Sequence, residues 1–164
     1  MTDTLSAPAV DTLTQLRAID KRTASDPRVS ELEARLVASA KALREDLIAA
    51  APEAEKLTHI PPHIERKLED AGLYRMFIPR EHGGLEVAPS TFAKVVIEIA
   101  KGDMGMAWNF CLAANHALML ANWFPVEIHE EVYDGGLFKA ASMYAPTFTA
   151  EPVDGGWMLN GVVN

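Results

Sequence analysis

The residue in this sequence best suited to chemistry is His116, which lies in a long segment without acidic or basic side chains. Residues 104–124 contain no Asp, Glu, Lys or Arg, and their apolar content predicts a single helix. An imidazole titrates near neutral pH, so a histidine held in such surroundings suits proton transfer. The alternative is a core histidine whose ring is satisfied by Asn109 or by a backbone carbonyl. The residues alone leave both interpretations open.

Ser142 is the second candidate, because it precedes a turn at Ala145-Pro146 on a predicted strand, residues 138–144. A hydroxyl at this position could contact a ligand, although most such serines bind only nearby backbone groups. No Gly-x-Ser-x-Gly motif surrounds it, so nucleophilic catalysis has no support. The aromatic residues of the uncharged segment are more typical of a core than of a cofactor platform: Trp108, Phe110, Trp123 and Phe124.

Other kinds of site find little support in the sequence. His59 and His63 have the spacing of paired metal ligands on a helix, but Pro61 and Pro62 lie between them, so no metal site is expected. The single cysteine, Cys111, allows no internal disulfide and is typical of apolar packing. The glycine pairs lack the motifs that bind phosphate groups, and they indicate turns.

The charge distribution argues against nucleic acid and membranes as partners. The chain of 164 residues has a formal charge of −8, and Lys139 is its only basic residue after Lys101. Phosphate backbones and anionic lipids attract basic stripes, which the C-terminal third lacks. The uncharged segment is long enough to cross a bilayer, but the polar side chains of Asn115, His116 and Asn122 favour a buried core helix. With one cysteine and no secretory signal, a cytoplasmic location is expected.

These candidates need a scaffold, and the patterning predicts a helical block followed by strands. Residues 1–27 are rich in Thr, Ser, Ala and Asp and are expected to form a flexible tail. The first helix is expected to begin with a capping box of Ser30 and Glu33. The predicted helices cover residues 30–51, 63–71, 89–102, 103–124 and 125–134. Gly72 is expected to end the second in a left-handed conformation, Asp103 to cap the fourth, and both residues 73–79 and the apolar stripe of the third helix to pack inward. The predicted extended segments cover residues 138–144, 147–151 and 157–163, the last two as a hairpin.

The expected fold class is therefore mainly α, with two parts after the tail. Residues 28–135 are expected to form a helical domain, and residues 136–164 the start of a β domain. The sequence stops directly after Val162-Val163, in an apolar strand that lacks a closing partner. Such an end is typical of a piece of a longer protein.

Three segments carry a resemblance to the acyl-CoA dehydrogenase superfamily. Residues 71–85, which read Ala-Gly-Leu-Tyr-Arg-Met-Phe-Ile-Pro-Arg-Glu-His-Gly-Gly-Leu, resemble its "aGLygl-iPeeyGGl" segment. Gly102-Asp103-Met104-Gly105 with Ala114-Asn115-His116 resembles its central helix, and residues 157–161 resemble its "dGyvLNG" strand. The resemblance implies a helical N-terminal domain, a middle β-barrel and a C-terminal helical domain that bind flavin between them and assemble as homotetramers. This chain would cover the first domain and the start of the second.

Within that superfamily the chain is most similar to the two-component flavin-dependent monooxygenases. Acyl-CoA dehydrogenases carry a Gly-Ser-Asp stretch after the first barrel strand, where this sequence reads Ser142-Met143-Tyr144-Ala145-Pro146-Thr147. The resemblance implies hydroxylation of a phenolic or polycyclic aromatic substrate through a C4a-hydroperoxyflavin, with reduced FAD or FMN supplied by a separate flavin reductase. The alternatives are an acyl-CoA dehydrogenase with tightly bound FAD and a helical interaction module without catalysis.

The same resemblance implies roles for individual residues. His116 would be the catalytic residue and would face the substrate, and Trp108 would belong to the wall around it. Ser142 would lie where flavin and substrate meet, and the main chain of Ser142, Met143, Tyr144 and Ala145 would contact the flavin. The 164-residue chain by itself is expected to be inactive, because most of the flavin site would lie elsewhere.

Overall fold

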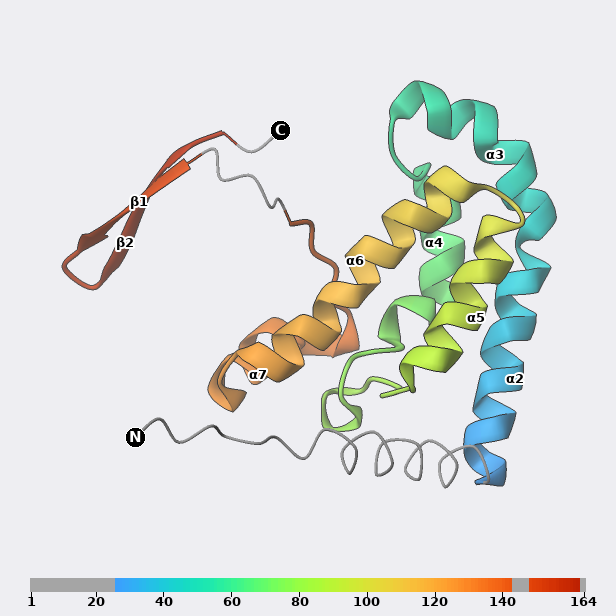
Figure 1. Cartoon of the computed structure of the whole chain (residues 1–164), viewed down its shortest axis with the longest axis horizontal. Helices are drawn as coiled ribbons and strands as arrows, with labels where there is room; N and C mark the ends of the chain where they lie inside the picture. The colour runs from blue at the N-terminus through green and yellow to red at the C-terminus, as the bar shows by residue number, and fades with distance from the viewer. Residues whose placement is uncertain (1–25, 143–147, 163–164) are drawn as a thin grey trace, which may run out of the picture.

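The computed structural model of this protein describes residues 26–142 and 148–162. Its helices are α2 (Pro27–Ala42), α3 (Arg44–Leu57), α4 (Pro62–Asp70), α5 (Pro89–Ala100), α6 (Met104–Trp123) and α7 (Val126–Val132). Short 3-10 turns are η1 (Leu73–Arg75), η2 (Arg80–His82) and η3 (Asp134–Gly136), and the strands are β1 (Phe148–Val153) and β2 (Gly156–Gly161). The predicted mainly α fold, with strands after the helices, is confirmed (Figure 1).

Helix α5 packs between α2 and α6 and forms the centre of the helical block (Figure 1). Its apolar stripe faces inward as predicted, with Phe92 and Ile99 buried. Residues 73–78 also pack inward as predicted, and the ring of Tyr74 lies 5.0 Å from that of Phe110 on α6, between centroids. Burial of these apolar side chains is the main source of stability for such a block.

The first predicted helix, residues 30–51, is two helices in the structure. The break at Leu43 lets Leu36 of α2 and Leu47 of α3 both face the core. The second helix then continues through Pro52, where the sequence predicts its end, and stops at Leu57. The buried residues of α3, Leu47 and Ala50, precede Pro52, and the helix continues beyond the proline with residues that are exposed or half-buried.

The predicted capping box of Ser30 and Glu33 is also wrong. Asp26 caps α2 instead, because its side chain accepts a hydrogen bond of 2.8 Å from the backbone N–H of Arg28. Glu33 therefore lies within the helix, and its carboxylate forms an ion pair of 2.5 Å with Lys94 of α5. The carboxylate joins two helices rather than closing the end of one.

Several other turns follow the sequence prediction. Gly72 has a φ of 72° after α4, which is the left-handed conformation expected of glycine there. Asp103 caps α6, accepting a hydrogen bond of 2.7 Å from the N–H of Met106. At Gly84 a Cβ atom would lie 1.9 Å from the carbonyl oxygen of Ile78, so this turn has room only for glycine.

The first predicted strand, residues 138–144, is not a strand where the structure describes it. Residues 137–142 have no regular secondary structure and meet α6, where the N–H of Ala140 donates to the carbonyl of Ala113 at 3.4 Å. A segment that contacts a helix rather than a neighbouring strand forms no ladder. The predicted contacts at Met143, Tyr144 and Ala145 lie outside the described residues, as does the predicted tail before Asp26.

The predicted hairpin is confirmed as the antiparallel pair β1 and β2, which stands apart from the helices in Figure 1. Directly paired residues share a face, so the register makes one face apolar and the other largely polar. All residues of both strands are exposed in this structure. The apolar hairpin face consists of Phe148, Ala150, Pro152, Trp157 and Leu159.

Candidate functional site

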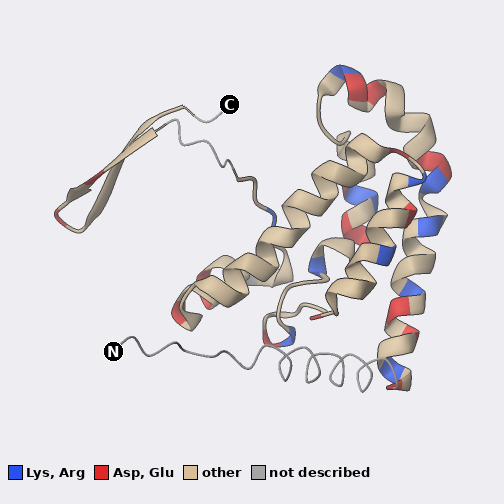
Figure 2. Ribbon diagram, viewed as in Figure 1, with Lys and Arg blue, Asp and Glu red and all other residues tan. Residues whose placement is uncertain are grey.

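Helix α6, predicted as a buried core helix, has one buried face and one open face in the structure. The buried face includes Phe110, with small residues such as Ala114 that allow neighbouring helices to approach closely. On the opposite side, Trp108 is 65% exposed and Trp123 is 70% exposed. Figure 2 shows the whole of α6 without a charged residue, in contrast to α2 and α5. No helix in the described residues combines the length and apolar character needed to cross a bilayer.

The open face of α6, as the term is used below, is the set of residues that follow the helix opposite the core. The first four members are each four residues apart, about one turn, and the last lies two turns further on, so their side chains share one side of the helix. Its members are Met104, Trp108, Leu112, His116 and Trp123. Of the core-forming aromatic residues predicted for this segment, only Phe110 is buried, whereas Trp108, Trp123 and Phe124 are exposed.

The ring of His116 has one satisfied and one unsatisfied nitrogen. Its Nδ1 lies 2.5 Å from the carbonyl oxygen of Leu112, and because a carbonyl can only accept, Nδ1 carries the proton. Its Nε2 is buried and has no hydrogen-bond partner in the described part of the chain. Asn109, the other partner considered from sequence, donates instead to the carbonyl of Gly105 at 3.0 Å. The free lone pair on Nε2 makes His116 able to accept a proton or a hydrogen bond.

The segment before Ser142 is held to the helical block by three consecutive residues. Phe138 packs edge-on against the ring of Tyr133, with 5.7 Å between centroids. Lys139 reaches α4, and the N–H of Ala140 reaches Ala113 of α6, which lies one turn before His116. Ser142 follows two residues later, within roughly 7 Å of chain from Ala140. The structure thus brings the segment of Ser142 to the same helix as His116.

Lys139 is the centre of a small charged cluster. Its ammonium lies 2.6 Å from Glu65 Oε1, 2.5 Å from Glu69 Oε1 and 4.9 Å from the centroid of the Tyr74 ring. Burial opposes protonation of Lys139, but the hydrogen bonds to Glu65 and Glu69 outweigh it and raise its pKa. The hydroxyl of Tyr74 donates to Glu65 Oε2 at 2.9 Å, and burial, with the nearby Glu65 charge, raises the pKa of Tyr74.

Two further polar side chains, which the sequence did not single out, join α7 and the residue after it to α6. The hydroxyl of Tyr133 donates to the carbonyl of Ala117 at 2.5 Å, and the Nε2–H of His129 donates to the carbonyl of Phe124 at 3.1 Å. Both side chains are buried, and burial raises the pKa of Tyr133. The only sequence signal is the aromatic and imidazole content of an otherwise acidic short helix.

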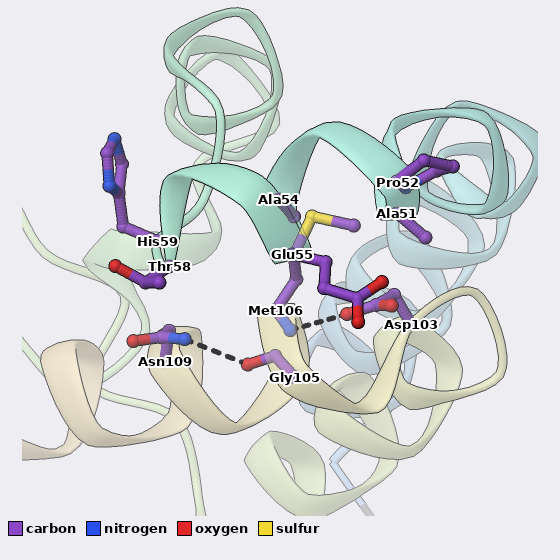
Figure 3. Close-up of a pocket in the computed structure, with 10 residues that line it drawn as sticks. All are labelled: Ala51, Pro52, Ala54, Glu55, Thr58, His59, Asp103, Gly105, Met106 and Asn109. Carbon is purple, nitrogen blue, oxygen red and sulfur yellow. Dashed lines mark hydrogen bonds between the residues drawn. The ribbon is translucent and has the colours of Figure 1, made fainter.

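A cavity of about 470 Å³ opens beside the first turns of α6 (Figure 3). It lies between that end of α6 and the C-terminal half of α3, and its polar lining includes Glu55, His59, Asp103 and Asn109. The predicted site residues do not line it. His59, considered from sequence as a metal ligand, contacts the carbonyl oxygen of Leu57 through Nδ1 at 2.7 Å.

Comparison with known proteins shows the family of the helical block. The family model for the acyl-CoA dehydrogenase N-terminal domain matches residues 30–124. The oxygenase component of p-hydroxyphenylacetate 3-hydroxylase from Acinetobacter baumannii is 34% identical over 112 residues, which are 68% of this chain and 26% of that protein.

Solved structures agree with this comparison. The HsaA monooxygenase from Mycobacterium tuberculosis has a TM-score of 0.72 at 26% identity, over 79% of this chain and 35% of that one. XiaF from Streptomyces sp., in complex with FADH2 and glycerol, has a TM-score of 0.76 at 25% identity, over 82% of this chain and 34% of that one. The chain therefore spans about a quarter to a third of the length of these relatives.

Proposed function

The chain belongs to the acyl-CoA dehydrogenase family through its N-terminal domain, and from this premise we propose that it is the N-terminal part of a flavin-dependent aromatic monooxygenase. The names of its relatives support this choice within the family. The relative from Acinetobacter baumannii acts on p-hydroxyphenylacetate, and the structural neighbour from Mycobacterium tuberculosis is a monooxygenase. The proposed substrate is accordingly a phenolic or polycyclic aromatic compound.

The observation that carries the proposal is the uncharged apolar open face of α6 beside the half-buried His116, whose Nε2 lies beneath the surface and has no hydrogen-bond partner in the described residues. Such a surface fits a flat aromatic ring, and the free lone pair on His116 Nε2 fits a phenol hydroxyl. The residues present therefore fit a reduced flavin with an aromatic substrate beside it. When bound, reduced flavin supplies the activated oxygen that is transferred to the ring.

Each residue then has a stated task. His116 Nε2 accepts the proton of the substrate hydroxyl, which makes the ring more electron-rich. Trp108 and Leu112 cover the substrate and exclude water, because both present apolar surface on the open face of α6. The hydroxyl of Ser142 would hold the flavin, as would the main chain of residues 143–145, which lie outside the described residues.

The test is the variant His116→Ala in the complete gene product, supplied with reduced flavin, oxygen and a panel of phenols. Loss of a positioned general base is expected to lower hydroxylation by roughly 10² to 10⁴-fold and to raise hydrogen peroxide release, with flavin binding retained. Asn122→Ala is the matched control, because Asn122 also bonds the carbonyl four residues before it on α6, that of Leu118, at 2.7 Å.

Three results would contradict the proposal. Unchanged coupling of oxygen use to product in His116→Ala would remove the role of the imidazole. Bleaching of oxidised flavin on addition of acyl-CoA would indicate acyl-CoA dehydrogenation, the other chemistry of the family. Complete absence of flavin-dependent turnover would favour a non-catalytic helical module.

The proposal extends to the partners of the enzyme. A separate flavin reductase supplies reduced FAD or FMN, and FADH2 in the XiaF complex supports the reduced form. The complete gene product acts in the cytoplasm as a homotetramer, and the exposed side chains of Trp123, Phe124 and Val126 are suited to burial between subunits. The 164-residue chain alone is inactive.

A further inference from the structure

We propose that Lys139 is a positioning residue, whose ammonium group fixes the segment carrying Ser142 to helix α4. Its catalytic consequence rests on the proposed function, whereas the anchoring concerns the described residues alone. Lys139 lies three residues before Ser142 and contacts two carboxylates of α4, Glu65 and Glu69, within 2.6 Å. A displacement of the backbone at Lys139 would therefore also displace Ser142.

The anchor is stronger than an ordinary surface ion pair. A single exposed pair contributes little to stability. Lys139, however, binds two carboxylates at once and lies over the Tyr74 ring, and its side chain is only 29% exposed. Charge-assisted hydrogen bonds to two partners, joined by a cation–π contact and only partly exposed to water, are stronger than a single exposed pair.

The Lys139 ammonium also offsets the electrostatic repulsion between the carboxylates of the two glutamates. Glu65 and Glu69 are one turn apart on α4, so their negative charges repel each other in the absence of a counter-charge. Glu65 is further held by the hydroxyl of Tyr74, which belongs to the buried segment after α4. The anchor therefore connects the irregular chain before Ser142 to the buried core beside α4.

Contacts of the two neighbouring residues, together with that of Lys139, fix the orientation of this segment. Phe138 packs on Tyr133, and Ala140 donates to α6, so three successive residues contact three different parts of the helical block. Of these contacts, only that of Lys139 uses charge. Removing the charge should loosen the segment without disturbing the core, because the remaining residues of α4, such as Leu68, stay buried.

The experiment compares Lys139→Met, Lys139→Arg and the control Lys94→Met in the complete gene product. Lys94 also forms an ion pair between elements, with Glu33, but lies on α5 and does not contact residues 137–142. Hydrogen exchange at the Ala140 amide measures the anchoring, and the ratio of hydroxylated product to hydrogen peroxide measures positioning. Thermal unfolding checks that each variant is folded.

In Lys139→Met, exchange at Ala140 should become roughly tenfold faster, because a hydrogen-bonded charge has been lost. The ratio of product to hydrogen peroxide should fall roughly tenfold, with a smaller change in the KM for the aromatic substrate, since small displacements cost mainly turnover. Lys139→Arg should restore both values, and Lys94→Met should match the wild type.

The outcomes separate this inference from the proposed function. Wild-type exchange at Ala140 in Lys139→Met overturns the anchoring. Faster exchange with an unchanged product ratio overturns the positioning role. If the wild-type protein oxidises no aromatic substrate, the proposed function fails, and exchange at Ala140 alone then decides whether Lys139 anchors the segment.

Discussion

At the scale of single residues, function and stability depend on where a proton is held. His116 holds its proton on Nδ1 against the carbonyl of Leu112, which leaves Nε2 unprotonated and without a hydrogen-bond partner in the described residues. Tyr74 holds its proton toward Glu65 in the core, where ionisation would place two negative charges together. A hydrogen bond therefore fixes the position of a proton both on a proposed catalytic group and on a structural one.

The raised pKa of Tyr74 makes a prediction about alkaline pH. The folded chain keeps the phenol proton above the ordinary pKa of 10.0, whereas the unfolded chain releases it. The stabilisation is therefore complete below pH 10 and is lost as the pH rises beyond it. Tyr74→Phe should be less stable than the wild type by about 1 kcal/mol at pH 8, through the lost hydrogen bond, with a shallower decline above pH 10.

Denaturant unfolding between pH 8 and 11 measures this difference. Lys139 also has a raised pKa, so its contribution is likewise lost as the pH rises, but both proteins retain it. A residual decline in Tyr74→Phe is therefore expected. Parallel curves for the two proteins would show that Tyr74 does not keep its proton on folding.

At the scale of elements, helix ends are where local preference and core packing compete. The sequence predicts the end of the first helical segment at Pro52, yet α3 continues to Leu57 and ends with Thr58 in the left-handed conformation, at a φ of 61°. Glycine is the usual residue there, and a β-branched side chain is strained. The structure accepts this strain because the last turns of α3 lie against the start of α6, around the cavity of Figure 3.

Thr58→Gly should therefore stabilise the protein, by about 1 kcal/mol, because glycine adopts a positive φ without steric cost. Chemical denaturation of the helical block measures the change. Thr91→Gly is a suitable contrast, since Thr91 is buried inside α5 and glycine there should destabilise the helix. A loss of stability in Thr58→Gly would mean that the threonine side chain makes a contact worth more than the strain.

Helix spacing and turn residues made much of this architecture predictable. The apolar stripe of α5, the cap at Asp103 and the hairpin at the C-terminal end all follow from local patterns that the structure confirms. The break at Leu43 and the anchor at Lys139 depend on contacts between residues far apart in sequence, which local patterns do not contain. His116 is a candidate from sequence because it is the only imidazole in the uncharged segment. The sequence does not show that its Nε2 is buried without a hydrogen-bond partner in the described residues.

At the scale of the whole molecule, the described chain has one packed part and one exposed part. The helical block buries aromatic and aliphatic side chains from α2 to α7, whereas every residue of β1 and β2 is exposed. Stability should therefore reside in the helices alone. The hairpin is suited to become part of a larger sheet, because its two faces already differ in polarity.

A shortened chain that ends after Ser142 tests this division. Its unfolding free energy should differ from that of the 164-residue chain by no more than about 0.5 kcal/mol, the usual range for exposed sites. Thermal melting and guanidinium unfolding, followed by helical circular dichroism, measure it. A large loss of stability would show that the hairpin packs on the helices in solution.

The apolar hairpin face also determines how the 164-residue chain should behave in a test tube. In the described residues each strand pairs only with the other. The backbone N–H and C=O groups along the outer edge of each strand can therefore pair with a strand of another molecule. Concentrated solutions should therefore become turbid and form a sediment with time, because hairpins of different molecules pair through their edge strands. Dilute handling at low salt, where the net charge of −8 keeps molecules apart, should delay this self-association.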